Sequence, residues 1–360
     1  MVFNGKNTLA VRVIFRVDSS TQMGVGHVMR CLSLADGLQE EGHSVSFICR
    51  KHKGNIIALI EQNGYFVFKL SEPQQVLTSL RSDGYEDLFH ARWLGARQVE
   101  DAHECSDYVA QKSVDYLIVD HYAIDYRWQM HLKPYCKKLV VIDDLADRKH
   151  DCDLLLDQTY ARAAKDYLPL VPDDCQLLLG AQYALLRPEF ARWREYSLNR
   201  RVKSELKRLL ITMGGVDPDN VTGDILAVLE RCALPKEIII TVVLGATAPH
   251  LDRVKKQVNK MSVLTELKIN VFNMAELMAN SDLAIGAAGA TTWERATVGL
   301  PSIILCLAEN QTKIAFSLQK KGLAIVITDK RTLTEHLGAV LDDIQQDIDM
   351  LSKLSVVSRK

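Results

Sequence analysis

The sequence predicts an α/β protein made of two Rossmann-like domains with a cleft between them. Short runs of β-branched and other apolar residues alternate with longer segments of helical periodicity, the pattern of parallel βαβ units. This alternation occurs twice, and a polar stretch rich in Arg and Lys separates the two series. With 360 residues, the chain also has the length of roughly two domains.

The first series begins with the apolar run at residues 11–17. The helical segment that follows, at about residues 27–39, places Val28, Leu32 and Leu38 on one face. The further strands expected in this half are residues 44–49, 65–70, 116–119 and 139–142, and the further helices are residues 54–63, 94–112 and 125–133. Together these elements make one complete doubly wound half.

The second series repeats this alternation after residue 208. Its expected strands are residues 209–213, 238–244, 267–272, 283–285, 302–307 and 324–328, and its expected helices are residues 220–232, 249–260, 274–280, 291–298 and 311–321. Residues 187–195 lead into the polar stretch, which has the composition of a connecting segment. We therefore expect domains at residues 1–200 and 201–360.

Composition excludes several classes of function. Lys and Arg number 44 against 45 Asp and Glu, and the formal net charge of -1 argues against nucleic acid or an anionic membrane as a partner. No run approaches the roughly 18 to 20 apolar residues of a membrane span, and the first residues lack the pattern of a secretory signal. The eight cysteines form no CxxC pair, so we expect reduced thiols in a cytoplasmic protein without a zinc site.

The first candidate site is the loop after the first strand, since open parallel sheets bind ligands beyond the carboxyl ends of their strands. Gly24 and Gly26 allow a tight turn there, and the helix that follows offers free N–H groups to an anion. His27 is the candidate general base, because an imidazole with a pKa of about 6.5 suits proton transfer at neutral pH. A structural or capping histidine is the alternative. Arg30 stands where the dinucleotide fingerprint has its third glycine, which disfavours NAD.

Two loops of the second domain are candidates for nucleotide binding. Small residues in the loop at 286–295 let the backbone approach a diphosphate, and Glu294 could accept hydrogen bonds from ribose hydroxyls. The alternatives are a first-turn capping glutamate and glycines kept for helix packing. The candidate residues of the two loops are Gly214, Gly215, Gly289, Ala290, Thr291, Thr292 and Glu294.

Polar residues also follow three other expected strands. In the run Asp120-His121-Tyr122, neighbours on an extended chain point to opposite faces, and His121 and Tyr122 are candidates for substrate contact. The amides of Asn310 and Gln311 could bind a sugar or a phosphate, or cap the next helix. The acidic stretch at 143–153 could bind a divalent cation, but a solvated loop is the expectation. We expect neither a metal nor a cofactor.

Collinear motifs give the chain a resemblance to a known family. Residues 16–30 contain D-S-S-x-x-x-G-x-G-H-x-x-R after a strand, and further segments match along nearly the whole chain: V-D-H-Y at 119–122, the acidic segment at 143–158, Y-A-L-L-R-P-E-F at 183–190, G-G-V-D-P-D-N at 214–220, G-A-T-T-W-E-R at 289–295 and A-E-N-Q at 308–311. In these motifs the chain resembles the UDP-2,4-diacetamido-2,4,6-trideoxy-beta-L-altropyranose hydrolases of pseudaminic acid biosynthesis. That family is similar in turn to the peptidoglycan N-acetylglucosaminyltransferase, which has the GT-B arrangement of two Rossmann-like domains.

The resemblance implies a small-molecule UDP-sugar substrate, hydrolysed to the free sugar and UDP. It implies that His27 is the catalytic base, that Asn310 lies in a substrate-contacting segment, and that the loop at 289–294 is the UDP site. By the same resemblance we expect Asp18, Ser19, Gly26 and Arg30 to bind substrate. The segment at about 80–110 is longer and more charged than expected of a compact member, which implies a remodelled pocket rim or an oligomer contact. A GT-B glycosyltransferase, a UDP-sugar 2-epimerase and a non-catalytic nucleotide-sugar-binding protein remain alternatives.

Overall fold

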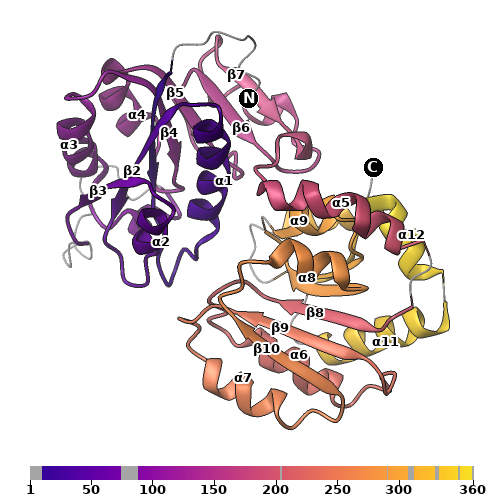
Figure 1. The fold of residues 1–360 in the computed structure, drawn as a ribbon. Helices are drawn as coiled ribbons and strands as arrows, with labels where there is room; N and C mark the ends of the chain where they lie inside the picture. Colours follow the sequence, from indigo (N-terminus) through magenta and orange to yellow (C-terminus); the bar gives the residue numbers. More distant parts are fainter. Residues whose placement is uncertain are drawn as a thin grey trace. The chain divides into compact units, whose positions relative to one another are not determined.

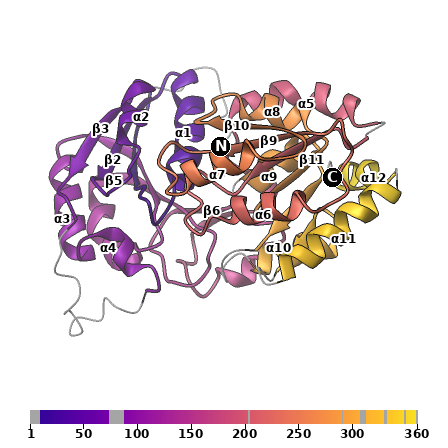
Figure 2. The same cartoon turned by 90° about the horizontal axis from the view of Figure 1, so that it is seen from below.

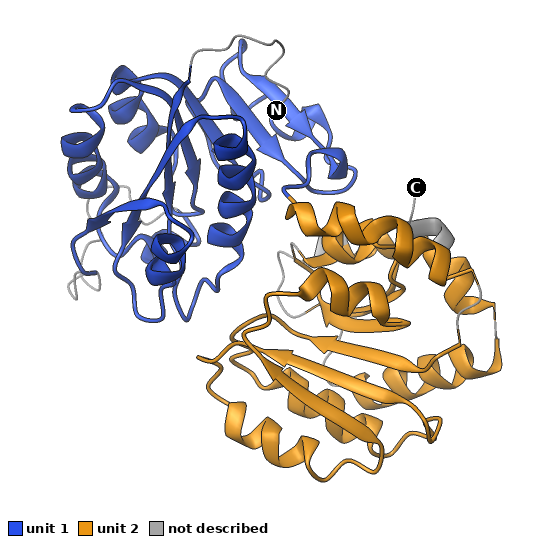
Figure 3. Cartoon of the chain, viewed as in Figure 1, with its two compact units in different colours: residues 1–185 blue, residues 186–360 orange. Residues whose placement is uncertain are grey.

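The chain divides into two compact units, residues 1–185 and residues 186–360 (Figure 3). The computed structural model describes residues 10–73, 88–202, 205–289, 291–306, 312–328, 332–347 and 349–358. Each unit is a parallel sheet with helices packed on it (Figure 1), which confirms the prediction of two Rossmann-like α/β domains. Within these ranges, no helix combines the length and the apolar character needed to span a membrane.

In the described part of the first unit, one sheet contains seven parallel strands in the order β3-β2-β1-β4-β5-β6-β7. The strands are β1 (Arg12–Val17), β2 (Ser44–Arg50), β3 (Phe66–Leu70), β4 (Val114–Asp120), β5 (Cys136–Ile142), β6 (Leu154–Asp157) and β7 (Gln176–Leu179). The helices are α1 (Gly26–Glu40), α2 (Ile57–Gln62), α3 (Gln98–Val109) and α4 (Tyr126–Leu132), with short 3-10 helices η2 (Ala91–Leu94), η3 (Lys133–Tyr135), η4 (Ala164–Asp166) and η5 (Ala181–Tyr183).

Strand β1 is buried on both faces, and its alternate residues serve two different layers. Val13 and Phe15 belong to the core that includes α1 and α2, whereas Ile14 belongs to the core that includes α3 and α4. Helices α3 and α4 lie side by side (Figures 1 and 2). Burial on both faces explains why this strand appears in the sequence as a continuous apolar run.

The strand order makes the β1/β4 pair the topological switch point of the first sheet. Strand β1 pairs with β2 on one side and with β4 on the other, and Val17 stands opposite Asp120 in the register. The connections after β1 and β4 therefore lead to opposite sides of the sheet. Such a point opens a natural ligand-binding position at the carboxyl ends of the strands.

In the described part of the second unit, six parallel strands have the order β10-β9-β8-β11-β12-β13. They are β8 (Arg208–Thr212), β9 (Ile239–Leu244), β10 (Leu264–Ile269), β11 (Leu283–Ala287), β12 (Ser302–Leu305) and β13 (Ile325–Ile327). The helices are α5 (Pro188–Arg200), α6 (Val221–Leu229), α7 (Leu251–Val258), α8 (Met274–Asn280), α9 (Thr291–Thr297), α10 (Thr312–Lys320), α11 (Leu333–Gln346) and α12 (Met350–Ser358).

The expected connecting segment is instead a helix of the second unit. Pro188 occupies the first turn of α5, a position that suits its missing N–H, and Phe190 is fully buried with Ala275 and Met278 of α8. Buried Arg201, just beyond α5, donates to the carbonyl oxygens of Met278 (2.7 Å) and Ser281 (2.5 Å) at the end of α8. Because α5 packs on α8, the units divide ahead of residue 186 rather than near residue 200.

Four further elements were not expected from the sequence. Strands β6 and β7 have four residues each, and β6 directly follows the acidic stretch at 143–153 that was expected to be a solvated loop. Helices α11 and α12 follow the last expected strand, and Leu337 and Leu341 of α11 are buried in the core of the second unit.

Candidate functional site

The loop between β1 and α1 brings His27 to the carboxyl edge of the first sheet. The loop folds back through a hydrogen bond from the N–H of Gly24 to the carbonyl oxygen of Ser20 (2.9 Å). Gly24 has a φ of +75°, a conformation that side chains with a Cβ rarely adopt. Helix α1 begins at Gly26, so His27 lies in its first turn, as the sequence predicts.

His27 contacts the buried carboxylate of Asp120, the last residue of β4. Nδ1 of His27 lies 2.6 Å from Oδ1 of Asp120. Arg30, one turn further along α1, donates to the same carboxylate from Nη2 to Oδ1 (2.6 Å) and from Nε to Oδ2 (2.6 Å). Asp120 is therefore fixed by a two-pronged bond from Arg30 and faces the imidazole.

The contact with Asp120 sets the tautomer of His27. A carboxylate only accepts hydrogen bonds, so Nδ1 carries the hydrogen and the lone pair of the neutral ring is on Nε2. Nη2 of Arg30 also lies 3.2 Å from Nδ1, but its shorter contact is to Asp120. A carboxylate behind Nδ1 is the arrangement that orients catalytic imidazoles and stabilises their protonated form.

Asp120 remains ionised at neutral pH. Burial alone would raise the pKa of its carboxyl group, but the charges of Arg30 and His27 outweigh burial and hold this pKa well below the usual range. Nη1 of Arg30 also lies 2.8 Å from Oδ2 of Asp144, so two carboxylates surround one guanidinium. A proton gained by His27 would complete the balance of charge in this cluster.

His121 and Asp18 form a second histidine–aspartate pair, which lies at the same ends of β1 and β4 as the pair of His27 and Asp120. Nε2 of His121 lies 3.3 Å from Oδ2 of Asp18, while Asp120 points to His27. Neighbours on this extended segment thus face opposite ways, as predicted. Nδ1 of His121 accepts a hydrogen bond from the N–H of Ala123 (3.0 Å), so Nε2 carries the hydrogen toward Asp18. Burial lowers the pKa of His121 and outweighs Asp18, which makes the ring neutral.

Asp18 and Ser19 hold the loop from inside. Oδ1 of Asp18 accepts from the backbone N–H of Arg50 (2.6 Å) and pairs with Nη1 of Arg16 (2.7 Å). Oγ of Ser19 accepts from the N–H of Ile56 (3.0 Å) ahead of α2. Both side chains are buried. These two residues, expected to bind substrate, therefore bond to neighbouring segments of the first unit and support the loop.

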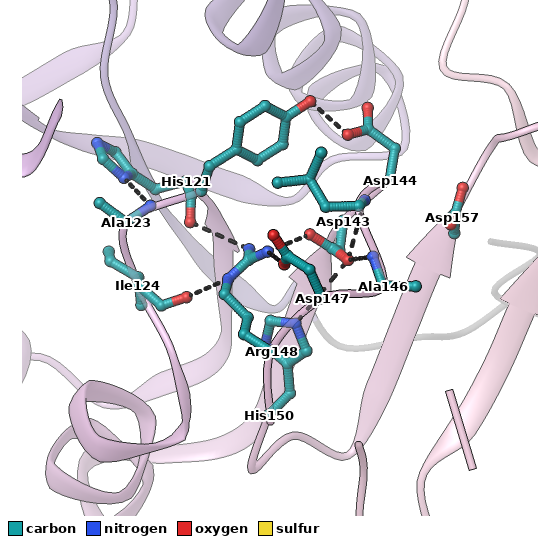
Figure 4. Close-up of polar contacts among 12 residues, drawn as sticks. His121, Ala123, Ile124, Asp143, Asp144, Ala146, Asp147, Arg148, His150 and Asp157 are labelled. Carbon is teal, nitrogen blue, oxygen red and sulfur yellow. Dashed lines mark hydrogen bonds and ion pairs between the residues drawn. The ribbon is translucent and has the colours of Figure 1, made fainter. Parts of the chain in front are cut away.

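The acidic stretch after β5 is an ion-pair network rather than a solvated loop (Figure 4). Asp143 is fully buried and pairs with Nη1 of Arg148 (2.8 Å). Arg148 also donates from Nε to the carbonyl oxygen of Ile124 (2.9 Å) and from Nη2 to that of His121 (3.4 Å). The stretch therefore ties the loop after β5 to the loop after β4. In the described ranges, no group of three or more His, Cys, Asp or Glu residues is arranged to hold a metal ion.

Asp144 connects this network to the His27 cluster. Its Oδ1 accepts a hydrogen bond from the hydroxyl of Tyr122, and its Oδ2 accepts from Arg30. The ring of Tyr122 meets that of His27 edge-on, with 4.5 Å between ring centres. Burial and the charge of Asp144 raise the pKa of Tyr122, which keeps its hydroxyl a donor. Of the first unit's expected site residues, His27, Arg30 and Tyr122 thus form one contiguous cluster.

The expected nucleotide loops of the second unit follow the adjacent strands β8 and β11. Gly214 lies just after β8, and the carbonyl oxygen of Gly215 accepts from the N–H of Gly245 after β9 (2.9 Å). After β11, the N–H of Gly289 donates to Oγ1 of Thr292 (3.2 Å). Both loops therefore lie at the carboxyl edge of one sheet, where helix N-termini favour anions.

A buried cation lies beneath the loop after β11. Arg295 donates to Oγ1 of Thr291 (3.3 Å), to Oγ1 of Thr292 (3.2 Å) and to the carbonyl oxygen of Ala287 (3.0 Å). Burial lowers the pKa of Arg295 to about 10. A Cβ at Gly286 would lie 2.4 Å from Nη1 of Arg295, so this glycine makes room for the guanidinium. The two threonine hydroxyls are thereby held in fixed orientations.

Glu294 is largely buried in the first turn of α9. Burial raises the pKa of its carboxyl group, while Arg187, whose Nη2 lies 3.3 Å from Oε1, opposes this effect. Three further site candidates, Ala290, Asn310 and Gln311, lie outside the described residues.

Two carboxylates at the centre of the site were not assigned a role from the sequence. Asp120 and Asp144 each end or follow a parallel strand, and that position was the available signal. Both carboxylates pair with Arg30, which lies 90 residues before Asp120 and 114 residues before Asp144 in the sequence. The sequence alone therefore does not show the pairing.

Comparisons with known proteins place this geometry in context. Residues 198–355 match the family model of the glycosyltransferase family 28 C-terminal domain. The chain is 29% identical over 315 residues to the UDP-2,4-diacetamido-2,4,6-trideoxy-beta-L-altropyranose hydrolase of Campylobacter jejuni, which covers 88% of this chain and 98% of that protein. It is 27% identical to a protein of Methanocaldococcus jannaschii over 86% of this chain, and spans 59% of the length of that protein.

A solved structure similar to this chain supports the fold class. The crystal structure of Acinetobacter baumannii MurG matches with a TM-score of 0.66 and 15% identity, over 97% of this chain and 94% of that one. This likeness confirms the predicted GT-B class. The sequence comparisons confirm the resemblance to the UDP-sugar hydrolases and, with it, the prediction of an enzyme.

Proposed function

We propose that this chain hydrolyses UDP-2,4-diacetamido-2,4,6-trideoxy-beta-L-altropyranose to the free sugar and UDP, as a step of pseudaminic acid biosynthesis. The observation that carries the proposal is the imidazole of His27, backed by Asp120 at 2.6 Å, at the switch point of the first sheet. A relative named for this reaction, similar over 98% of its own length, supports the choice of substrate.

In the proposed reaction, Nε2 of His27 takes a proton from water while the water oxygen attacks the anomeric carbon of the sugar. The bond between that carbon and the diphosphate oxygen breaks, and UDP leaves with the electron pair. Asp120 stabilises the imidazolium that forms, and the paired Arg30 keeps Asp120 ionised and in place. General base catalysis of this kind contributes typically about a hundred- to ten-thousand-fold in rate.

We assign UDP binding to the C-terminal domain and the catalytic base to the N-terminal domain. The loops at Gly214 and Gly289 offer backbone N–H groups and the Thr291 and Thr292 hydroxyls to a diphosphate, and Glu294 suits the two ribose hydroxyls. Arg187 and Arg295 supply positive charge near this carboxylate and this loop. Gly26, His121 and Tyr122 of the first unit, together with Ala290, Asn310 and Gln311, remain proposed substrate contacts.

The reaction is tested by incubating the protein with the UDP-sugar alone and following proton NMR signals. We expect free 2,4-diacetamido-2,4,6-trideoxy sugar and UDP in equal amounts. His27→Asn keeps a side-chain amide that can bond to Asp120 but removes the basic nitrogen, so turnover should fall by about a hundredfold or more. Its affinity for UDP, measured by calorimetry, should match that of the wild type. Near wild-type turnover by this variant would reject His27 as the base.

A glycosyltransferase is the second candidate, because residues 198–355 match the C-terminal domain of a glycosyltransferase family. The same incubation separates the candidates. A transferase would release little free sugar and would form UDP and a glycosylated product only when an acceptor is added. A 2-epimerase would yield a sugar of changed configuration at C2, and a binding protein would leave the UDP-sugar intact.

A further inference from the structure

Aromatic side chains extend outward from the catalytic imidazole along one short segment. Phe89, His90 and Trp93 lie in and just before η2, and with Tyr122 they form what we call the aromatic cluster. The ring of Tyr122 touches His27 at 4.5 Å, His90 lies 5.2 Å from Tyr122, and Phe89 lies 4.8 Å from His90. The cluster thus forms a continuous chain of rings from a buried imidazole to the surface.

The outermost ring of the cluster, that of Phe89, is open to solvent although it is large and apolar. Phe89 is 90% exposed, the largest fraction among the large apolar side chains in the described residues. His90 and Trp93 are half-buried, with 4.3 Å between their ring centres, and Trp93 packs its inner side against the core of the first unit. Exposed apolar surface that continues into a polar catalytic cluster is typical of ligand-binding sites.

The segment that carries these rings is anchored. Leu94 and Ala96 are buried, and Gly95 ends η2 with a φ of +71°. A Cβ at Gly95 would lie 2.8 Å from Cε1 of His52, so the chain passes close against the end of β2 at this point. On the other side of the cluster, the guanidinium of Arg148 lies 5.9 Å from the ring centre of Tyr122. The end of η2 next to Trp93 is therefore anchored on the first unit.

We propose that the aromatic cluster is the subsite for the sugar, and that it selects hexoses whose hydroxyl groups are replaced by methyl-bearing substituents. This inference rests on the proposed function: if His27 activates water for attack at the anomeric carbon, the group beside His27 is the sugar ring. A 2,4-diacetamido-2,4,6-trideoxy hexose carries two acetyl methyl groups and a methyl group at C6. Methyl groups and ring C–H bonds bind aromatic faces well, whereas hydroxyl groups would be left without partners there.

Phe89→Ala is the direct test, because the exposed Phe89 side chain contributes little to folding. We expect KM for the UDP-trideoxy sugar to rise roughly fivefold to tenfold with kcat nearly unchanged, the loss expected for one aromatic contact. The Ki of UDP alone as a competitive inhibitor should stay within twofold. Trp93→Phe, which keeps an aromatic ring and the fold, should give a smaller rise in KM.

Phe66→Ala is the matched control, since Phe66 is 60% exposed but begins β3 at the opposite end of the strands. It should leave KM unchanged. UDP-N-acetylglucosamine keeps the C6 hydroxyl and has one acetamido group. The wild type should bind it more weakly than the trideoxy substrate, whereas Phe89→Ala should bind the two sugar nucleotides about equally. An unchanged KM in Phe89→Ala, or an equal loss of UDP affinity, would overturn the sugar subsite.

Calorimetry separates failure of this inference from failure of the proposed function. If the wild type binds the UDP-trideoxy sugar without cleaving it, the hydrolase assignment fails, and the affinity of Phe89→Ala relative to wild type still decides the subsite. If the wild type binds this sugar nucleotide no more tightly than UDP, the aromatic cluster does not recognise the sugar and the inference is rejected.

Discussion

Nδ1 of His27 and Oδ1 of Asp120 lie 2.6 Å apart although 93 positions separate the two residues in the sequence. His27 lies in the first turn of the helix that follows β1, and Asp120 is the last residue of β4. These two strands are neighbours in the sheet. The contact between His27 and Asp120 therefore depends on strand order, because the pairing of β1 with β4 brings the two side chains together. Arg30, on the same face of α1 as His27, closes the cluster.

Replacing Asp120 with Asn should abolish most of the proposed activity. The amide can donate to Nδ1 and so favours the tautomer with hydrogen on Nε2, which cannot act as a base. We expect kcat to fall by about a thousandfold or more, by analogy with other oriented catalytic imidazoles. Asp115→Asn is the matched control, because Asp115 lies at the opposite end of the same strand. Turnover within tenfold of wild type in Asp120→Asn would show that Asp120 does not orient the base.

Asp144 should act as a positioning residue through Arg30 and Tyr122. Asp144→Asn keeps the size of the side chain but weakens its charged bond to Arg30 at 2.8 Å. We expect kcat to fall by roughly threefold to tenfold, with UDP affinity unchanged. Asp147→Asn is the control, because the carboxylate of Asp147 lies in the same loop and pairs with Arg148 rather than with Arg30 or Tyr122. Equal effects of the two variants on kcat would point to general disturbance of the loop.

The sequence predicts the position of these groups better than their pairing. Each candidate of the first unit was located from the end of an apolar run, and the structure places His27, Arg30 and Tyr122 together at such ends. Asp120 could not be matched to His27 without the strand order, which depends on packing between distant segments. The same limit applied to α5. Its many Arg residues give it the composition of a linker, and the buried Phe190 that packs it on α8 stands among polar residues in the sequence.

The acidic stretch should make the first unit sensitive to acid. Burial would raise the pKa of Asp143, but Arg148 and His150 outweigh burial and hold it well below the usual value. Because the folded-state pKa lies below the unfolded value of about 3.9, Asp143 stabilises the fold above that pH and loses this contribution as pH falls further. In Asp143→Asn, the free energy of unfolding should change less steeply between pH 5 and 3, by up to about 1.4 kcal/mol per pH unit.

Urea titrations at several pH values measure this slope. Asp143→Asn also weakens an ion pair and will lower stability at pH 7, so the comparison is of slopes rather than of absolute stabilities. Asp173→Asn, at an exposed aspartate of the same unit, should retain the wild-type slope. A slope in Asp143→Asn equal to that of the wild type would show that the pairing with Arg148 does not govern acid stability.

Two adjacent arginines at the end of α5 should differ sharply in their contribution to the second unit. Arg201 is buried and donates to the carbonyl oxygens of Met278 and Ser281 at the end of α8. Arg201→Met removes this charged donor and leaves the two oxygens only longer bonds of 3.3 Å, from the N–H of Ser281 and from Nη1 of Arg200. We expect a loss of about 3 kcal/mol in the free energy of unfolding. Arg200→Met removes a partly exposed pair with Asp282 and should cost about 1 kcal/mol or less. Because the two substitutions are alike in chemistry and adjacent in sequence, equal losses in chemical denaturation would contradict the assignment of α5 to the core of the second unit.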